Sequence, residues 1–333
     1  MRAAVFRGLG QKLEICDLPD PRPGTDELLI SIGRCGICGS DLHMTEDQTF
    51  GLSPGSILGH EFAGEVVETG PGVVGFSIGD RVTVPPMQGC GHCAYCLADE
   101  PGHCPQMVLL GGGYGELSCI QARQAVRLPA GVSLANGALV EPLAVALHGI
   151  RKSSIRPGDK VVVLGAGPIG LATAFWARRM GAARVVVTDL GSWQEQRALA
   201  MGATHFVSGD ADHVALADAL LGSKADIVFE CVGAPGLIAQ AIQHLRPKGE
   251  ILVQGLCTRP DNFIPFHAIM KECRIQFSNF FHLAEFQAAL DMFDSGAAEP
   301  GLMITDTIKL DQLPGTFEAL RQRTHQCKVQ IAH

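Results

Sequence analysis

Four cysteines in one short segment are spaced to bind a metal ion. The segment GCGHCAYCLADEPGHC places them at Cys90, Cys93, Cys96 and Cys104, in the pattern C-x2-C-x2-C-x7-C. Short C-x2-C steps point neighbouring thiolates at one ion, and four sulfur ligands suit tetrahedral zinc. Because the protein would fill every coordination position, we interpret this site as structural. The alternatives are an iron–sulfur cluster and unrelated thiols.

A second set of possible ligands is chemically mixed. Cys38 lies in RCGICGSDLH, and His60 and Glu61 lie in SILGHEF. Sulfur, nitrogen and oxygen donors from separate segments suit a metal that keeps one coordination position open for substrate. Glu141, in ALVEPLAVALH, is a fourth candidate. The alternative is a buried thiol and an ordinary core histidine.

The charge of this second set leaves one question open. If Cys38, Glu61 and Glu141 all bound a divalent ion as anions, the site would be negatively charged and the ion would be a weaker Lewis acid. We therefore expect one glutamate to be loosely held or to act through water. The sequence does not say which one.

A glycine-rich segment predicts a nucleotide site. In VVVLGAGPIG, Gly165, Gly167 and Gly170 follow an apolar strand and open a helix, as in the loop that holds the pyrophosphate of a dinucleotide at a helix N-terminus. The next strand, RVVVTD, ends in Asp189. A carboxylate there would bind the adenine ribose hydroxyls and repel the 2′-phosphate of NADP, so we predict NAD. The alternative is an ordinary strand–helix turn with a surface aspartate.

The elements that would position these residues form two patterns. Residues 1 to about 140 alternate short β-branched runs with Gly and Pro turns, which is typical of β-rich structure. After Pro157, strands and helices alternate, which predicts a parallel sheet covered on both faces. The last fifty residues are mixed and could return to the first domain. The predicted strands are 161–164, 184–188, 226–231, 250–254 and 275–279, and the predicted helices are 168–180, 192–201, 213–221, 235–245 and 284–295.

Taken together, these motifs resemble the zinc-dependent medium-chain dehydrogenase/reductase family of alcohol and polyol dehydrogenases. The resemblance covers nearly the whole chain and includes CGICGSDLH, GHEFAGEVVETG, GDRV, EPLAVALH, LGAGPIG and ILVQGL. It implies an α/β protein with a GroES-like β-rich catalytic domain at 1–141 and 282–333, and a Rossmann NAD-binding domain at 142–281. It also implies a homodimer or homotetramer.

The resemblance also assigns roles to single residues. Cys38, His60, Glu61 and Glu141 match the catalytic-zinc motif, with Glu141 as in the sorbitol, butanediol and threonine dehydrogenase branch. Ser40 matches a hydroxyl beside the metal, and His43 matches the outer end of a proton relay. The residues that match the cofactor site are Gly165, Gly167, Pro168, Ile169, Gly170, Asp189, Val232, Gly255 and Leu256.

This chain departs from the family pattern in two places. Some polyol relatives have an arginine five residues after the ribose carboxylate, where this chain has Gln194, and the nearest arginine is Arg197. This puts a contact to adenine in doubt. The segment 105–112 is short for the family, which could alter the substrate entrance.

The expected activity is hydride transfer between NAD and a secondary alcohol, diol or polyol, giving a ketone or aldehyde. Two zinc ions per chain are expected, and the proton would leave through Ser40 and His43. The alternatives are an L-threonine 3-dehydrogenase-like activity and a non-catalytic nucleotide-binding protein on the same frame. Neither the specific substrate nor the physiological direction can be derived from the sequence.

Composition narrows the setting of the protein. The 333 residues carry a formal net charge of −8, which argues against nucleic-acid or anionic-membrane partners. The N-terminus, MRAAVFRGLG, lacks the features of a signal peptide, and no apolar run is long enough to span a bilayer. Twelve cysteines in such a chain indicate metal binding and packed thiols in a reducing, cytoplasmic setting.

Overall fold

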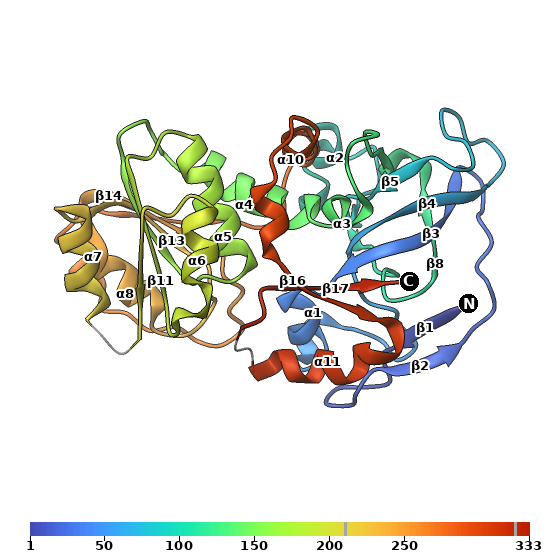
Figure 1. Cartoon of the computed structure of the whole chain (residues 1–333), viewed down its shortest axis with the longest axis horizontal. Helices are drawn as coiled ribbons and strands as arrows, with labels where there is room; N and C mark the ends of the chain where they lie inside the picture. Colours follow the sequence, from blue (N-terminus) through green and yellow to red (C-terminus); the bar gives the residue numbers. More distant parts are fainter. Residues whose placement is uncertain (210–211, 323–324) are drawn as a thin grey trace. The chain divides into compact units, whose positions relative to one another are not determined.

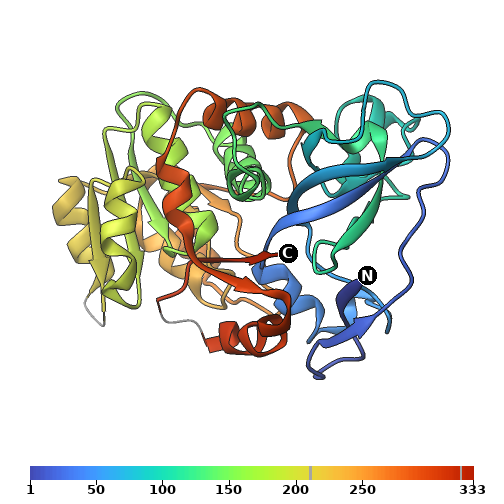
Figure 2. The ribbon, with the colours of Figure 1, turned by 45° about the vertical axis from the view of Figure 1, so that its right-hand side comes forward.

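The chain forms two compact units in the computed structural model, which describes residues 1–209, 212–322 and 325–333. The first unit comprises Met1–Glu141 and His282–His333, and the second comprises Pro142–Phe281. The first is therefore built from two separate stretches of chain. In both views its red C-terminal strand, β17 (Lys328–Ala332), lies beside the blue strand β3 (Glu27–Gly36) (Figures 1 and 2).

The first unit is organised around a seven-stranded sheet. Its strand order is β16-β17-β3-β4-β5-β9, and β8 pairs with β3 off this path. The pairing is antiparallel except between β16 and β17. The strands other than β3 and β17 are β4 (Glu61–Thr69), β5 (Arg81–Thr83), β8 (Leu117–Gln121), β9 (Val126–Arg127) and β16 (Ile304–Lys309).

Two small sheets and short helices complete this unit. The small sheets pair β1 (Arg2–Val5) with β2 (Glu14–Asp17) and β6 (Met87–Gln88) with β7 (Val108–Leu109). The α-helices are α1 (Gly39–Met44), α2 (Ala94–Leu97), α3 (Leu134–Gly137), α10 (Leu283–Asp294) and α11 (Leu313–Ala319). Short 3-10 turns lie at Gln48–Phe50, Pro101–His103, Ala122–Gln124, Glu299–Met303, Leu310–Gln312 and Leu320–Gln322.

The core of the first unit joins both of its stretches. Ile30 and Phe62 from the central strands are buried in one apolar cluster with Phe317 and Ile331 from the C-terminal stretch. Burying side chains of this size contributes about 1.5–3 kcal/mol each. The last fifty residues are therefore part of this domain's core.

The second unit is a parallel sheet with the strand order β12-β11-β10-β13-β14-β15. Numbered along the chain this is 3-2-1-4-5-6, the order of a doubly wound dinucleotide-binding sheet. Its strands are β10 (Lys160–Leu164), β11 (Arg184–Asp189), β12 (His205–Ser208), β13 (Ala225–Glu230), β14 (Leu245–Val253) and β15 (Arg274–Phe277). Its helices are α4 (Val140–Lys152, which begins in the first unit), α5 (Pro168–Arg179), α6 (Glu195–Ala200), α7 (His213–Leu221), α8 (Leu237–His244) and α9 (Pro265–Ile269), and a 3-10 turn covers Ser192–Gln194.

These elements confirm the predicted fold class of a β-rich GroES-like part and a Rossmann part. Each predicted strand and helix is present, with shifts at its ends. In the second unit, the sequence pattern missed helix α4 and the two short elements β12 and α9. Four or five residues are too few to display a hydrophobic period. Among the described residues, no helix is both long and apolar enough to cross a membrane.

Candidate metal centres and dinucleotide site

The four cysteines predicted to bind structural zinc come together in one small lobe. The ligand atoms of Cys90, Cys93, Cys96 and Cys104 all lie within 4.8 Å of one another, and we call this group the cysteine lobe. The Sγ atoms of Cys90 and Cys96 are 3.9 Å apart. Zinc–sulfur bonds of about 2.3 Å place tetrahedral sulfurs roughly 3.8 Å apart, so the lobe fits zinc.

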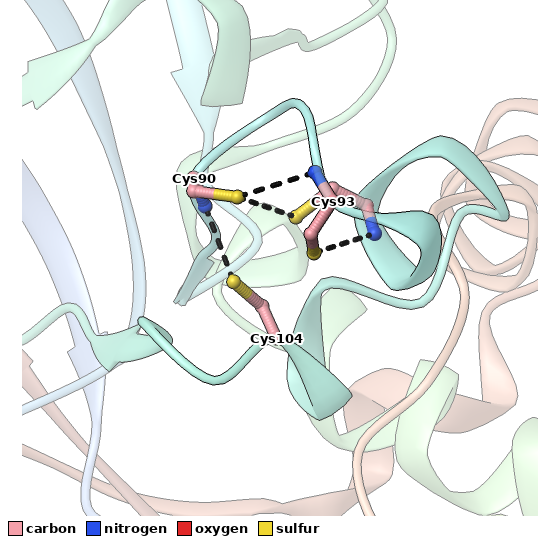
Figure 3. A group of neighbouring side chains, drawn as sticks. Cys90, Cys93 and Cys104 are labelled. Carbon is pink, nitrogen blue, oxygen red and sulfur yellow. Dashed lines mark hydrogen bonds between the residues drawn. The ribbon is translucent and has the colours of Figure 1, made fainter.

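Backbone N–H groups prepare these sulfurs to carry negative charge. The amide of Cys93 points at the Sγ of Cys90, and that of Cys96 at the Sγ of Cys93 (Figure 3). The backbone N–H of His92 is the largest factor that lowers the pKa of the Cys90 thiol to about 6. Within the described chain the His92 ring contacts the carbonyl of Cys90, and His103 lies beside Glu100, so neither ring joins the sulfur set.

The second predicted centre is also assembled. The ligand atoms of Cys38, His60 and Glu61 lie within 4.8 Å of one another, and we call this set the mixed-donor centre. Sheet pairing explains their meeting, because β3 and β4 are antiparallel and Gly36 lies opposite Glu61. Cys38 then follows β3 as the N-cap of α1, while His60 directly precedes β4. Two segments separated in sequence thus meet at one end of a strand pair.

A buried aspartate orients two members of this centre. Asp41 accepts a hydrogen bond from the backbone N–H of Cys38 at 3.0 Å, and its other oxygen lies 3.2 Å from Nδ1 of His60. The Tyr114 hydroxyl donates to the same carboxylate at 2.6 Å. Burial opposes ionisation of Asp41, but these neighbours outweigh it and lower its pKa. With Nδ1 held by a carboxylate, Nε2 is the ring nitrogen available to a metal.

Glu61 is held by a cation that sequence reasoning missed. The Nζ of Lys328 lies 2.7 Å from Oε1 of Glu61, and both side chains are buried. Lys328 also donates to the carbonyl of Ile37. The second oxygen of Glu61, Oε2, is buried and has no hydrogen-bond partner in the described chain. An orphaned carboxylate oxygen beside a thiol and an imidazole fits a metal ion.

Glu141 occupies a different position from the other candidate ligands. It lies in the first turn of α4 and is buried, but it does not belong to the group whose donor atoms lie within 4.8 Å. Burial raises the pKa of its carboxyl group to about 7, with Glu61 raising it further and His60 opposing. The structure therefore groups Glu61, rather than Glu141, with Cys38 and His60.

The two predicted relay residues lie on helix α1, whose N-cap is Cys38. Ser40 Oγ donates to the Sγ of Cys38 at 3.2 Å. His43 lies three residues further along the same helix and is half-buried. Residues three apart lie on the same helix face. Ser40 and His43 thus lie along one side of α1, next to the thiol.

The glycine-rich segment forms the expected strand–turn–helix. Gly165 follows β10 with a φ of 96°, in the left-handed region, and Gly167 caps α5, whose first residue is Pro168. A Cβ on Gly170 would lie 1.9 Å from the carbonyl oxygen of Gly165, so only glycine fits there. Asp189, at the end of β11, accepts a hydrogen bond from the backbone N–H of Ala166 at 2.7 Å. Asp189 and the glycine loop are therefore directly joined.

The loops after β13 and β14 also come together. The buried carboxylate of Glu230 accepts the backbone N–H groups of Val232 and Gly233, both at 2.8 Å, and its backbone carbonyl accepts that of Gly255. A Cβ on Gly255 would lie 2.1 Å from the nitrogen of Gly233, so glycine is needed where the loops touch. Leu256 follows and is exposed. Sequence reasoning missed Glu230, although its position at a strand end before a glycine was visible.

Comparison with known proteins matches both units. Residues 24–130 match the model of the alcohol dehydrogenase GroES-like domain, and residues 168–295 match that of zinc-binding dehydrogenases. A sorbitol dehydrogenase from Halalkalibacterium halodurans is 34% identical over 313 residues, which are 91% of each chain. The chain belongs to the zinc-dependent alcohol dehydrogenase family. The predicted family is thereby confirmed, and with it the prediction that the protein is a dehydrogenase.

Solved structures of other family members have the same architecture. The (2R,3R)-butanediol dehydrogenase of Bacillus subtilis superimposes with a TM-score of 0.88 at 30% identity, over 100% of this chain and 99% of the other. A zinc-binding dehydrogenase from Sinorhizobium meliloti, bound to NADP, gives a TM-score of 0.90 at 30% identity with the same coverage. The family resemblance therefore extends from sequence to the whole backbone.

Proposed function

We propose that this protein is a zinc- and NAD-dependent dehydrogenase of diols or polyols. It would oxidise a secondary hydroxyl group to a ketone or a terminal hydroxyl group to an aldehyde. The observation that carries the proposal is the mixed-donor centre, whose thiol, imidazole and carboxylate converge next to Ser40. The substrate class follows the sorbitol and butanediol dehydrogenases among its relatives.

Cys38, His60 and Glu61 would hold the catalytic zinc, and the four sulfurs of the cysteine lobe would hold a second, structural zinc. A zinc ion bound in the mixed-donor centre would lower the pKa of a substrate hydroxyl. Glu141 lies outside this donor group, so we propose that it acts through water or on substrate arrival.

The remaining steps use the chain's own residues. Asp41 holds the His60 ring, and Lys328 restrains Glu61. The Ser40 hydroxyl would accept the substrate proton while releasing its own towards His43, and the half-buried His43 ring would pass a proton to solvent. The glycine loop and the Val232 and Gly255 loops would hold the dinucleotide, so that its nicotinamide receives the hydride.

We propose NAD as the preferred cofactor because of Asp189. Its two oxygens each accept one backbone N–H group, from Ala166 and Leu190, and this fixes the carboxylate where ribose hydroxyls can still donate to it. A 2′-phosphate would meet this negative charge. One structure of a similar dehydrogenase is bound to NADP, so membership of the family does not fix the choice between NAD and NADP. Our proposal therefore depends on Asp189. Asp189→Gly should reduce the NAD-over-NADP preference at least about tenfold, which kcat/KM with each cofactor measures. An unchanged ratio would remove the argument.

The test of the activity is a substrate panel combined with metal analysis. Nicotinamide absorbance would be followed with diols, sugar alcohols, simple secondary alcohols and L-threonine. Turnover of diols or polyols and two zinc ions per chain are expected. Turnover of L-threonine alone would favour the threonine dehydrogenase alternative. One zinc ion per chain and no turnover would favour a non-catalytic nucleotide-binding protein.

We also propose that the protein is a cytoplasmic homodimer or homotetramer. β15 is the end strand of its sheet, and large apolar side chains on and beside α9 and β15 are exposed: Ile264, Phe266, Ile269, Met270 and Phe277. An exposed apolar sheet edge favours pairing with a second copy. The twelve cysteines are free thiols, which suits a reducing compartment. Light scattering should give a molar mass that is a multiple of 35.3 kDa. The double variant Ile269→Glu with Phe277→Glu should have a lower molar mass.

A further inference from the structure

The second unit carries a charged pocket that the dehydrogenase activity does not use. It has a volume of about 280 Å³ and lies at the amino ends of β10, β13, β14 and β15. Seven of its nine lining residues are charged, in a chain in which only 18% of residues are. The glycine loop follows the carboxyl end of β10, roughly 16 Å away for a five-residue strand. The two sites are therefore separate.

Cations outnumber carboxylates in this pocket, although the chain as a whole is acidic. Four basic side chains line it, against three acidic ones, while the net charge of the chain is −8. The basic residues are Arg156, Arg246, Lys248 and Arg274, and we call this site the basic pocket.

The three carboxylates are already engaged by backbone groups. Glu250, which is buried, accepts both the N–H and the hydroxyl of Ser154, at 2.7 and 2.6 Å. Asp226 accepts the backbone N–H of Lys160 at 2.8 Å, and Asp159 accepts that of Arg156 at 2.7 Å. These bonds fix the pocket wall, and Asp226 and Glu250 also pair with Arg246 and Arg274.

The basic side chains still keep donors free. The guanidinium of Arg156 has no partner within the described part of the chain, and Lys248 reaches only Glu272, at 3.9 Å between exposed side chains. Arg246 donates Nε to Asp226 and Nη1 to the carbonyl of Pro247. Arg274 donates one nitrogen to Ser154 and lies 3.6 Å from Glu250, so each arginine retains further N–H groups. The backbone of Lys248 has a φ of 60°, in the left-handed region, and its N–H donates to the carbonyl of Lys271.

We propose that the basic pocket binds the phosphate group of a small phosphorylated compound. Planar guanidinium groups match phosphate oxygens with paired hydrogen bonds, and several cations around one concave site suit a dianion. The three carboxylates of the pocket order its loops by accepting backbone N–H groups. Bound phosphate would link the segment after α4 to the first residues of β14 and β15.

The test is binding of inorganic phosphate and of glycerol 3-phosphate to the zinc-loaded enzyme, with NADH saturating the dinucleotide site. Calorimetry and thermal unfolding would be compared with sodium chloride at equal ionic strength. We expect saturable binding and a rise in Tm with at least one of the two probes. Tighter binding of glycerol 3-phosphate would identify an organic phosphate as the ligand, and tighter inorganic phosphate would identify the free ion.

Variants decide whether this pocket is responsible. Arg156→Gln with Lys248→Gln removes two cations that have no buried partner, and should weaken phosphate binding at least about tenfold while NADH binding is unchanged. Lys12→Gln with Arg22→Gln removes the same charge from the surface of the first unit and should leave phosphate binding intact. The proposal is overturned if phosphate behaves like chloride, or if the two double variants weaken binding equally.

Discussion

The cysteine lobe and the mixed-donor centre differ in how their parts are distributed along the chain. All four sulfurs of the lobe lie within fifteen residues, and backbone amides of the same segment point at them. The mixed-donor centre draws its donor atoms from two segments and depends on an orienting aspartate with its tyrosine and on a lysine 267 residues away from Glu61. The cysteine lobe therefore depends on one loop, whereas the mixed-donor centre depends on the whole first unit.

The largest expected effect separates the two centres by activity. Cys38→Ala removes a ligand of the mixed-donor centre and should reduce kcat/KM for the alcohol about 1,000-fold or more, because the zinc ion is displaced or lost. Zinc content should fall from two ions to one, and the cysteine lobe should keep its ion. Full NAD⁺ reduction by this variant would contradict the proposed centre.

The matched change in the cysteine lobe should act on stability instead. Cys104→Ala removes one sulfur of a closed site and should lower the free energy of unfolding by several kcal/mol, since structural zinc contributes folding energy. Molecules that stay folded at low temperature should retain their KM for substrate. Chemical denaturation and zinc analysis measure both effects, and a variant with normal stability would show that the lobe has no structural role.

The long-range support of the mixed-donor centre can be removed without touching a ligand. Lys328→Met leaves Glu61 buried without its cation and should cost about 3–5 kcal/mol of stability. Lys328→Met combined with Glu61→Gln should recover most of this loss, because the unpaired charge is gone. Lys12→Met, at an exposed lysine, is the control and should change little. Equal stability of the first variant and this control would disprove the role of the ion pair.

The smallest expected effect concerns a buried group with no local support. Burial lowers the pKa of His244 to about 4, and neither ring nitrogen has a partner within the described residues. Between about pH 4 and 6.5 the ring is neutral in the folded protein but gains a proton in the unfolded chain. The contribution of His244 to the free energy of unfolding is therefore complete above pH 6.5 and is lost as the pH falls toward 4. Between pH 7.5 and 5.5 this amounts to roughly 1 kcal/mol.

Denaturation at the two pH values checks this prediction. His244→Leu should flatten the pH dependence by that amount, whereas His267→Gln, at an exposed histidine, should leave it unchanged. An identical slope in wild type and His244→Leu would show that another group is responsible. His244 thus provides a case opposite to His60, whose ring is held by Asp41.

The same difference explains how much the sequence could predict. Local spacing and strand–helix alternation indicated the four sulfurs, the glycine loop and both parts of the fold. Cys38, His60 and Glu61 were proposed from the unlike donors in two short motifs, and the resemblance to a known family then assigned them to one centre. Lys328 carried no signal, because a lone lysine in a mixed C-terminal segment acquires its role only when β17 pairs with β3. Tyr114 is similar, since its partner is set by packing. Glu230 had a visible position at a strand end, but its partners are set by loop geometry.

The position of Lys328 on the last strand has a consequence for synthesis of the protein. The thiol, imidazole and carboxylate emerge from the ribosome early, but the cation that neutralises Glu61 emerges 267 residues later, with β17. Until then β3 lacks its neighbour β17, and the first unit has a large gap in sequence to close. A chain that lacks β17 therefore holds Cys38, His60 and Glu61 beside an unfinished sheet, and the mixed-donor centre is complete only after β17 has paired with β3.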